Sequence, residues 1–170
     1  MTVQTLPEIL LVDARVDAIE TLAADVAGRA RLRVIDAGED AIAVLTGLLA
    51  EGPVAALHVV AHGAPGRLML GRGMVDATAL LERSALTAGW SAALAGSDIL
   101  LYACEAGRGA EGARLVEVLA GLTGARVAAA PSLVGATASG PDWTLDVTTG
   151  AAEAGAMLFS PSCARAMPVC

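Results

Sequence analysis

Few cysteine and histidine side chains are present in this sequence to serve as a nucleophile and its general base. The 170 residues include two histidines and three cysteines but neither lysine nor asparagine, so all 11 basic residues are arginines. The sequence therefore excludes a Schiff-base or P-loop lysine, an N-glycosylation acceptor and an asparagine that orients a catalytic histidine. For a cysteine nucleophile with a histidine base, the candidates are Cys104, Cys163, Cys170, His58 and His62.

His62 and Cys104 each follow an apolar run that is typical of a buried β-strand. The run at 55–61 ends at His62, and the run at 98–103 ends at Cys104. Because ligands collect at the carboxyl ends of the strands in an open parallel sheet, we expect the fold to bring both residues to one edge. Cys104 also precedes a predicted helix, whose positive N-terminus would favour a thiolate.

These residues are the components of nucleophilic acyl transfer. The backbone N–H groups of Gly63 and Cys104 could both point at one oxyanion, because Gly63 has no Cβ to block the approach. With no asparagine in the chain, a third residue that orients the histidine must be a carboxylate such as Asp13 or a backbone carbonyl. Two plainer interpretations remain: Cys104 as a small buried hydrophobic residue, and His58, which lies within an apolar strand, as a core residue.

Residues 107–112 (GRGAEG) match the glycine fingerprint of dinucleotide-binding folds. The context does not fit, because the motif follows the fourth central strand and the next strand ends without an acidic residue for a ribose. We expect these glycines to form a tight turn that exposes Cys104. We expect no cofactor and no metal, since the sequence lacks H-E-x-x-H and C-x-x-C motifs and its histidines are four residues apart on a strand.

The elements that must position these residues alternate between strands and helices, which predicts a doubly wound α/β fold: a mainly parallel sheet with helices on both faces. Strands are predicted at 8–13, 31–36, 55–61, 98–103 and 126–130, a hairpin at 67–71 and 73–75, and a late edge strand at 143–147. Helices are predicted at 14–28, 39–50, 76–94 (interrupted near 88–89) and 111–122, the last capped by Gly124. We expect one domain over 1–150 and an irregular tail over 151–170. Cys163 and Cys170 could pair in that tail, which would leave Cys104 free.

The net charge and the hydropathy of the sequence limit the classes of partner that we expect. The net charge of −7 argues against nucleic acid or an anionic membrane as the main partner. No apolar window is long enough for a membrane span, and the first 12 residues lack the basic region of a signal peptide. The expectation is a cytoplasmic protein or one exported by a C-terminally directed route, and the sequence leaves the oligomeric state open.

Five segments carry a resemblance to known families. An apolar strand ending in His-Gly and a later one ending in Cys resemble the clan CD cysteine peptidases, among them caspases, gingipains, legumains and separases. More closely, the chain is similar to a bacterial domain of unknown function found near the head of very large repeat-containing adhesins and calcium-binding surface proteins. The segments are LLVDARV (10–16), LHVVAHGAPGRLMLG (57–71), LLYACEAGRGAEG (100–112), LAGLTGARVAAA (119–130) and GPDWTLDVTTG (140–150).

The clan CD resemblance implies a caspase-like three-layer sandwich and a role for each candidate residue. His62 matches the general base and acid, Cys104 the nucleophile, and Gly63 a donor to the oxyanion. Residues after the first strand shape the specificity pocket in that clan, which makes Asp13 and Arg15 candidate substrate contacts. An Asp there would favour a basic residue before the scissile bond. Glu105, next to the cysteine, is a further candidate contact.

The resulting hypothesis is a cysteine endopeptidase that acts on a peptide or protein substrate, with self-processing of a larger surface protein as one role. The alternative is a catalytically silent domain that uses the same edge for binding, or for secretion and assembly of adhesin-type proteins. The enzyme hypothesis requires that Cys104 be accessible and near the His62 ring.

Overall fold

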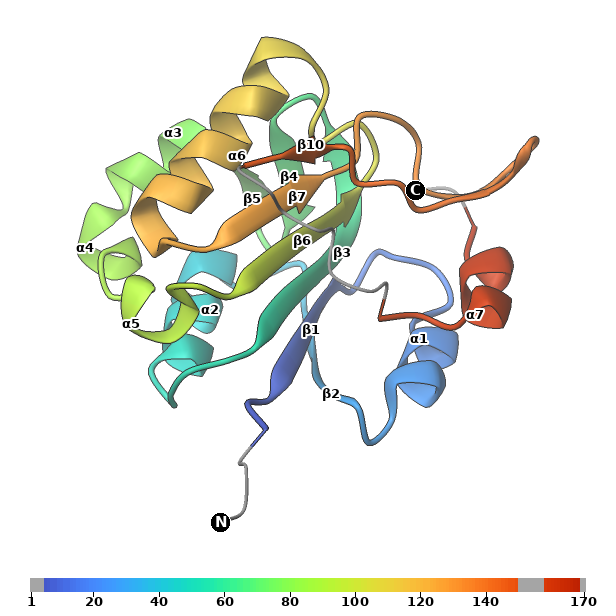
Figure 1. Cartoon of the computed structure of the whole chain (residues 1–170), viewed down its shortest axis with the longest axis horizontal. Coiled ribbons are helices and arrows are strands. Elements are labelled where there is room, and N and C mark those ends of the chain that lie inside the picture. Colours follow the sequence, from blue (N-terminus) through green and yellow to red (C-terminus); the bar gives the residue numbers. More distant parts are fainter. Residues whose placement is uncertain (1–4, 150–157, 169–170) are drawn as a thin grey trace.

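The computed structural model describes residues 5–149 and 158–168, which form an α/β fold built on a mostly parallel sheet (Figure 1). In the described residues the sheet has eight strands, with the order β10-β7-β6-β3-β1-β2 and with β4 and β5 continuing from β3. The strands of the sheet are β1 (Glu8–Asp13), β2 (Ala30–Ile35), β3 (Ala56–Ala64), β4 (Arg67–Leu70), β5 (Gly73–Asp76), β6 (Asp98–Ala103), β7 (Arg126–Ala129) and β10 (Val147–Thr148). Strands β2, β1, β3, β6 and β7 run parallel, whereas β10 and the β4–β5 hairpin pair antiparallel. The predicted doubly wound fold is confirmed.

Helices cover both faces of the sheet (Figure 1). They are α1 (Ile19–Val26), α2 (Ala41–Leu49), α3 (Ala77–Glu82), α4 (Ser84–Thr87), α5 (Ser91–Leu94), α6 (Gly109–Thr123) and α7 (Pro161–Ala166). One apolar core lies between the sheet and α2 to α6, and a second lies between the sheet and α1 and α7. Since side chains alternate along a strand, even-numbered residues of β3 and β6, such as Val60 and Tyr102, enter the second core. None of the helices in the described part of the chain is long and apolar enough to cross a membrane.

Strand β3 is longer than predicted, and the additional residues include His62 and Gly63. It pairs with β6 up to Ala61 and Ala103, and then continues through His62 and Gly63 to pair with β4. A two-residue turn follows Ala64, with Gly66 at φ 69°, which glycine adopts without strain. The predicted hairpin is therefore present as β4 and β5.

Several predicted elements differ from the structure. Helix α1 begins at Ile19 and not at 14, because residues 14–18 form turns at the edge of the sheet. The predicted helix at 76–94 is three short helices. The predicted strand at 143–147 is absent except for Val147 in β10, and a small hairpin precedes it, formed by β8 (Gly135–Thr137) and β9 (Gly140–Asp142).

The C-terminal tail was predicted to be irregular, but its described part contains α7. Ser160 caps this helix by accepting a hydrogen bond from the Cys163 N–H at 3.2 Å. Phe159, Cys163 and Met167 are buried in the second core, and Trp143 donates to the Ala164 carbonyl at 3.0 Å. Residues 158–168 are therefore part of the folded unit. Residues 151–157 and 169–170 of the predicted tail lie outside the described residues.

Candidate functional site

The order of the strands along the chain reverses between β1 and β3. From β1 the chain moves outward to β2 and then returns to β3 on the other side, from which it proceeds to β6 and β7. In a doubly wound sheet, ligands bind at the carboxyl ends of the two strands where the order reverses. Asp13 ends β1, and His62 lies near the end of β3.

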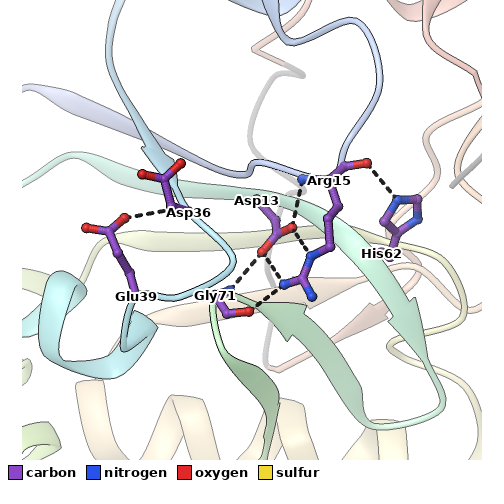
Figure 2. Close-up of polar contacts among 6 residues, drawn as sticks. All are labelled: Asp13, Arg15, Asp36, Glu39, His62 and Gly71. Atoms are coloured by element: carbon purple, nitrogen blue, oxygen red, sulfur yellow. Dashed lines mark hydrogen bonds and ion pairs between the residues drawn. The ribbon is translucent and has the colours of Figure 1, made fainter.

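The His62 ring is held by the backbone of the loop after β1. Its Nε2 lies 3.1 Å from the carbonyl oxygen of Arg15, as Figure 2 shows. A carbonyl oxygen only accepts, so Nε2 carries a hydrogen and donates; in the neutral form of an imidazole with this tautomer, the lone pair lies on Nδ1. Of the two orienting groups that the composition allowed, a backbone carbonyl makes the contact.

Asp13 and Arg15 form a compact ion pair beneath that carbonyl. Asp13 is fully buried, and each of its carboxylate oxygens accepts two hydrogen bonds. Oδ1 accepts from the Arg15 backbone N–H at 3.0 Å and from Arg15 Nε at 2.7 Å, and Oδ2 accepts from Arg15 Nη2 and the Gly71 N–H, both at 2.8 Å. Arg15 Nη2 also donates to the Gly71 carbonyl at 2.6 Å (Figure 2). We call these three residues the Asp13 clasp.

The clasp keeps Asp13 ionised although it is buried. Burial alone would raise the pKa of this carboxyl, but the hydrogen bonds from Arg15 and Gly71 and the guanidinium charge outweigh burial and lower the pKa. With all of its acceptor sites engaged, Asp13 presents no free carboxylate to a substrate. In this arrangement it is a structural partner of Arg15 and not the charged wall of a specificity pocket. The Arg15 side chain is 37% exposed but turned toward Asp13 and Gly71.

Cys104 directly follows β6, beside the His62 position of β3. Ala61 of β3 is paired with Ala103 of β6; the next residue after Ala61 is His62, and the next residue after Ala103 is Cys104. Cys104 packs in the second core with Val60 and Tyr102, which is the face that the alternation of β3 also gives to His62. Since neighbouring strands lie about 5 Å apart, the fold brings the two predicted residues together at one edge.

The Cys104 side chain, however, is covered. It is 4% exposed, and the buried Val134 lies against it, with its N–H donating to Sγ at 3.2 Å. The sulfur is also disulfide-bonded. The expectation of an accessible, free Cys104 is therefore wrong for this state of the molecule.

The other cysteines do not pair with each other. Cys163 is a free and buried thiol, and burial and the nearby Asp25 raise its pKa although Arg29 opposes them. A Cys163–Cys170 disulfide is therefore not formed. Cys170 itself lies outside the described residues.

Gly63 makes the close approach of β3 to β6 possible. A Cβ built on Gly63 would lie 2.6 Å from the carbonyl oxygen of Cys104 and 2.9 Å from the Ala103 Cβ. Ala64 and Arg67 flank the two-residue turn, so Gly63 opposite Leu68 is in a non-hydrogen-bonded pair and its N–H is directed away from β4. That direction suits the predicted donor to an oxyanion.

The residues after Cys104 form a tight turn, but the turn does not expose the cysteine. Glu105 has a φ of 58°, which is unusual for a residue with a side chain, and its carboxylate is paired with Arg108. The glycine motif serves packing: a Cβ on Gly112 would lie 2.0 Å from the Gly107 carbonyl carbon. These glycines allow α6 to begin directly above the turn.

Three further residues shape the site, and little in the sequence pattern pointed to them. Gly71 lies 58 positions from Asp13 and is visible in the sequence only as a hairpin turn. Val134, which covers Cys104, lies in a segment without periodicity, and Met167 lies beyond the predicted domain. Both residues line a small cavity of about 20 Å³ beside His62 and Tyr102. No cluster of ligating side chains in residues 5–149 and 158–168 could hold a metal ion.

Fold and site together define an α/β domain with a histidine and a cysteine at the ends of adjacent parallel strands. Residues 9–167 match the model of the family described as Domain of unknown function (DUF4347). The chain belongs to this family, as the sequence resemblance to such a domain indicated. A search of curated proteins gave no matching relative.

Proposed function

We propose that this chain is a caspase-like cysteine endopeptidase of the clan CD type. His62 is the general base and acid, Cys104 the nucleophile and Gly63 a donor to the oxyanion. The observation that carries the proposal is the hydrogen bond from His62 Nε2 to the Arg15 carbonyl, made at the strand end beside Cys104. It leaves Nδ1 as the proton acceptor of a ring whose orientation is fixed.

The reaction proceeds in two stages. The Cys104 sulfur attacks the peptide carbonyl carbon while its proton passes to His62, and the N–H groups of Gly63 and Cys104 stabilise the oxyanion. The C–N bond then breaks, and the His62 imidazolium protonates the leaving amine. Water activated by His62 hydrolyses the thioester and releases the acid and the free thiol.

This chemistry requires a reduced and uncovered Cys104. Its burial under Val134 and its disulfide bond favour a second candidate, a catalytically silent domain that binds or assembles through the same edge. Self-processing of a larger surface protein remains the role we propose for an active form. The two candidates differ in whether the reduced thiol reacts under the control of His62.

Alkylation of the fully reduced protein distinguishes them. Iodoacetamide modification of each cysteine is followed by mass spectrometry in wild type, His62→Gln and Cys104→Ala, with Cys163 as an internal reference because burial raises its pKa. We expect Cys104 to react at least tenfold faster in wild type than in His62→Gln. Equal, slow modification of all three cysteines that is indifferent to His62 would refute the enzyme.

Peptide acyloxymethyl ketones with a basic, an acidic or an apolar residue before the warhead then test for peptidase activity. Covalent capture by Cys104 that requires His62 supports an endopeptidase. Alkylation by iodoacetamide without capture of any of these peptides supports the silent domain.

A further inference from the structure

We infer that Asp13 is a positioning residue: through Arg15 and Gly71 it fixes the backbone carbonyl that orients the His62 ring. The catalytic meaning of this role rests on the proposed function, but the positioning itself does not. Asp13 does not contact His62; it acts through Arg15, whose carbonyl accepts from Nε2 at 3.1 Å.

The first step is local. Arg15 lies in the loop between β1 and α1, where the N–H groups of its two neighbours donate to backbone carbonyls, Ala14 to Ile35 at 2.9 Å and Val16 to Asp13 at 3.0 Å. Asp13 Oδ1 accepts from the Arg15 N–H at 3.0 Å, and the same carboxylate accepts from Nε and Nη2 of the guanidinium. Both the N–H and the side chain of Arg15 are thereby tied to one buried carboxylate. The peptide unit that contains the Arg15 carbonyl is also held by the Val16 N–H, which donates to the Asp13 backbone carbonyl. The side chain and the backbone of Asp13 together restrict the direction of the Arg15 carbonyl.

The second step joins the loop to the strand that carries the histidine. Gly71 donates to Asp13 and accepts from Arg15, and it lies in the turn between β4 and β5. Strand β4 pairs with the end of β3, with Met69 opposite His62. The clasp therefore connects the His62 backbone, through the hairpin, to the carbonyl that its ring contacts.

The third step is energetic. A fully buried carboxylate costs several kcal/mol of desolvation, and an apolar side chain of similar size would often stabilise a core as well or better. Asp13 follows the apolar β1 residues Leu10, Leu11 and Val12, all buried, so an apolar residue would suit the strand. A carboxylate that accepts two hydrogen bonds at each oxygen instead gives a single fixed geometry at the strand end.

The chain contains only two histidines, which makes the test direct. In reduced, ¹⁵N-histidine-labelled protein, His62→Gln assigns the two imidazoles, and the solvent-exchange lifetime of the His62 Nε2–H is measured by NMR. The variants are Asp13→Asn, which replaces one acceptor with a donor, and Arg15→Lys, which keeps the charge but loses the two-pronged contact. The matched control is Glu51→Gln, which also removes an acid paired with an arginine, Arg31, but on the exposed surface.

We expect the lifetime of the His62 ring N–H to fall at least tenfold in Asp13→Asn and Arg15→Lys and to change less than twofold in Glu51→Gln. Where wild-type Cys104 alkylation depends on His62, its rate should fall by a similar factor in both clasp variants. If Asp13→Asn does not fold, Arg15→Lys carries the test.

A folded clasp variant that melts earlier than wild type but keeps its ring N–H lifetime and Cys104 rate would show a purely structural role and overturn the inference. A wild-type ring N–H too short-lived to observe would overturn it as well. A third outcome separates the two proposals. If the His62 ring N–H is long-lived in wild type and short-lived in the clasp variants, but the rate of Cys104 alkylation does not depend on His62, the positioning role is supported and the peptidase is refuted.

Discussion

Asp13→Asn should destabilise the folded chain by about 3 kcal/mol. The amide oxygen can still accept from the Arg15 N–H and Nε, but the NH₂ group would face two donors, the Gly71 N–H and Arg15 Nη2. Leaving the buried Gly71 N–H without a partner costs about 1–3 kcal/mol, and the lost charge-assisted bond to Arg15 costs about 1.5–3 kcal/mol. Because the Arg15 side chain is 37% exposed, water replaces part of its loss, and the sum falls near the lower end.

Urea unfolding followed by circular dichroism measures this difference, and a shift in Tm of about 6–12 °C should accompany it. The difference should also depend on pH. The pKa of Asp13 is lowered in the folded state, so its ionic contribution is present above the unfolded value near 3.8 and is lost as the pH falls through the folded value. The gap between wild type and Asp13→Asn should therefore be widest near pH 6 and narrow below about pH 4. A loss under about 1 kcal/mol, or a gap that stays constant down to pH 3, would refute the account of the clasp.

Four further substitutions test the close packing of glycines in β3 and α6 and the titration of His58. Gly63→Ala should cost about 1–3 kcal/mol in urea unfolding, because the added Cβ meets the Cys104 carbonyl oxygen at 2.6 Å; wild-type stability would contradict the close approach. Within α6, Gly112→Ala should destabilise the chain, because the added Cβ meets backbone atoms of Gly107. Gly121→Ala should stabilise the chain by about 0.5–1 kcal/mol, because its Cβ meets no other atom. A change of the same sign in both variants would count against this difference. Burial lowers the pKa of His58 although Glu8 opposes it. The free energy of unfolding of the wild type should therefore decline as the pH falls below about 6.5, and it should decline less in His58→Gln. An equal decline in both proteins would contradict this.

The central strands could be predicted from the sequence because each is a short apolar run ended by a polar residue. The observed bounds of β1 and β6 match the predicted ones, and Gly124 caps α6 at φ 69° as expected. The break of the 76–94 helix at Arg83 coincides with no glycine or proline, so a sequence pattern of helical period did not predict it. The 143–147 segment alternates in burial, with Leu145 buried, but burial alternation does not specify a hydrogen-bonded partner strand.

The site could be predicted to the level of strand ends and no further. The rule for open parallel sheets placed His62 and Cys104 at one edge, and the absence of asparagine reduced the orienting groups to a carboxylate or a carbonyl. The sequence pattern could not show that both Asp13 oxygens accept hydrogen bonds, because one partner, Gly71, is brought to Asp13 by a hairpin. Nor could it show the cover over Cys104, since Val134 belongs to a segment whose position depends on α7, through the hydrogen bond from the Ala136 N–H to the Met167 carbonyl.

The two halves of the site are therefore prepared to different degrees. The base is already oriented, because the Arg15 carbonyl holds the His62 ring and buried ionic contacts hold Arg15. The nucleophile must be reduced and uncovered before it can react, and uncovering requires Val134 to move while the strand ends stay in place. Since a loop segment opens at lower free energy than the strands it covers, we expect Val134 to move without disturbing the clasp. Uncovering of Cys104 should thus precede the reaction of the reduced protein as a fast equilibrium, so that the observed rate still depends on the oriented His62 ring.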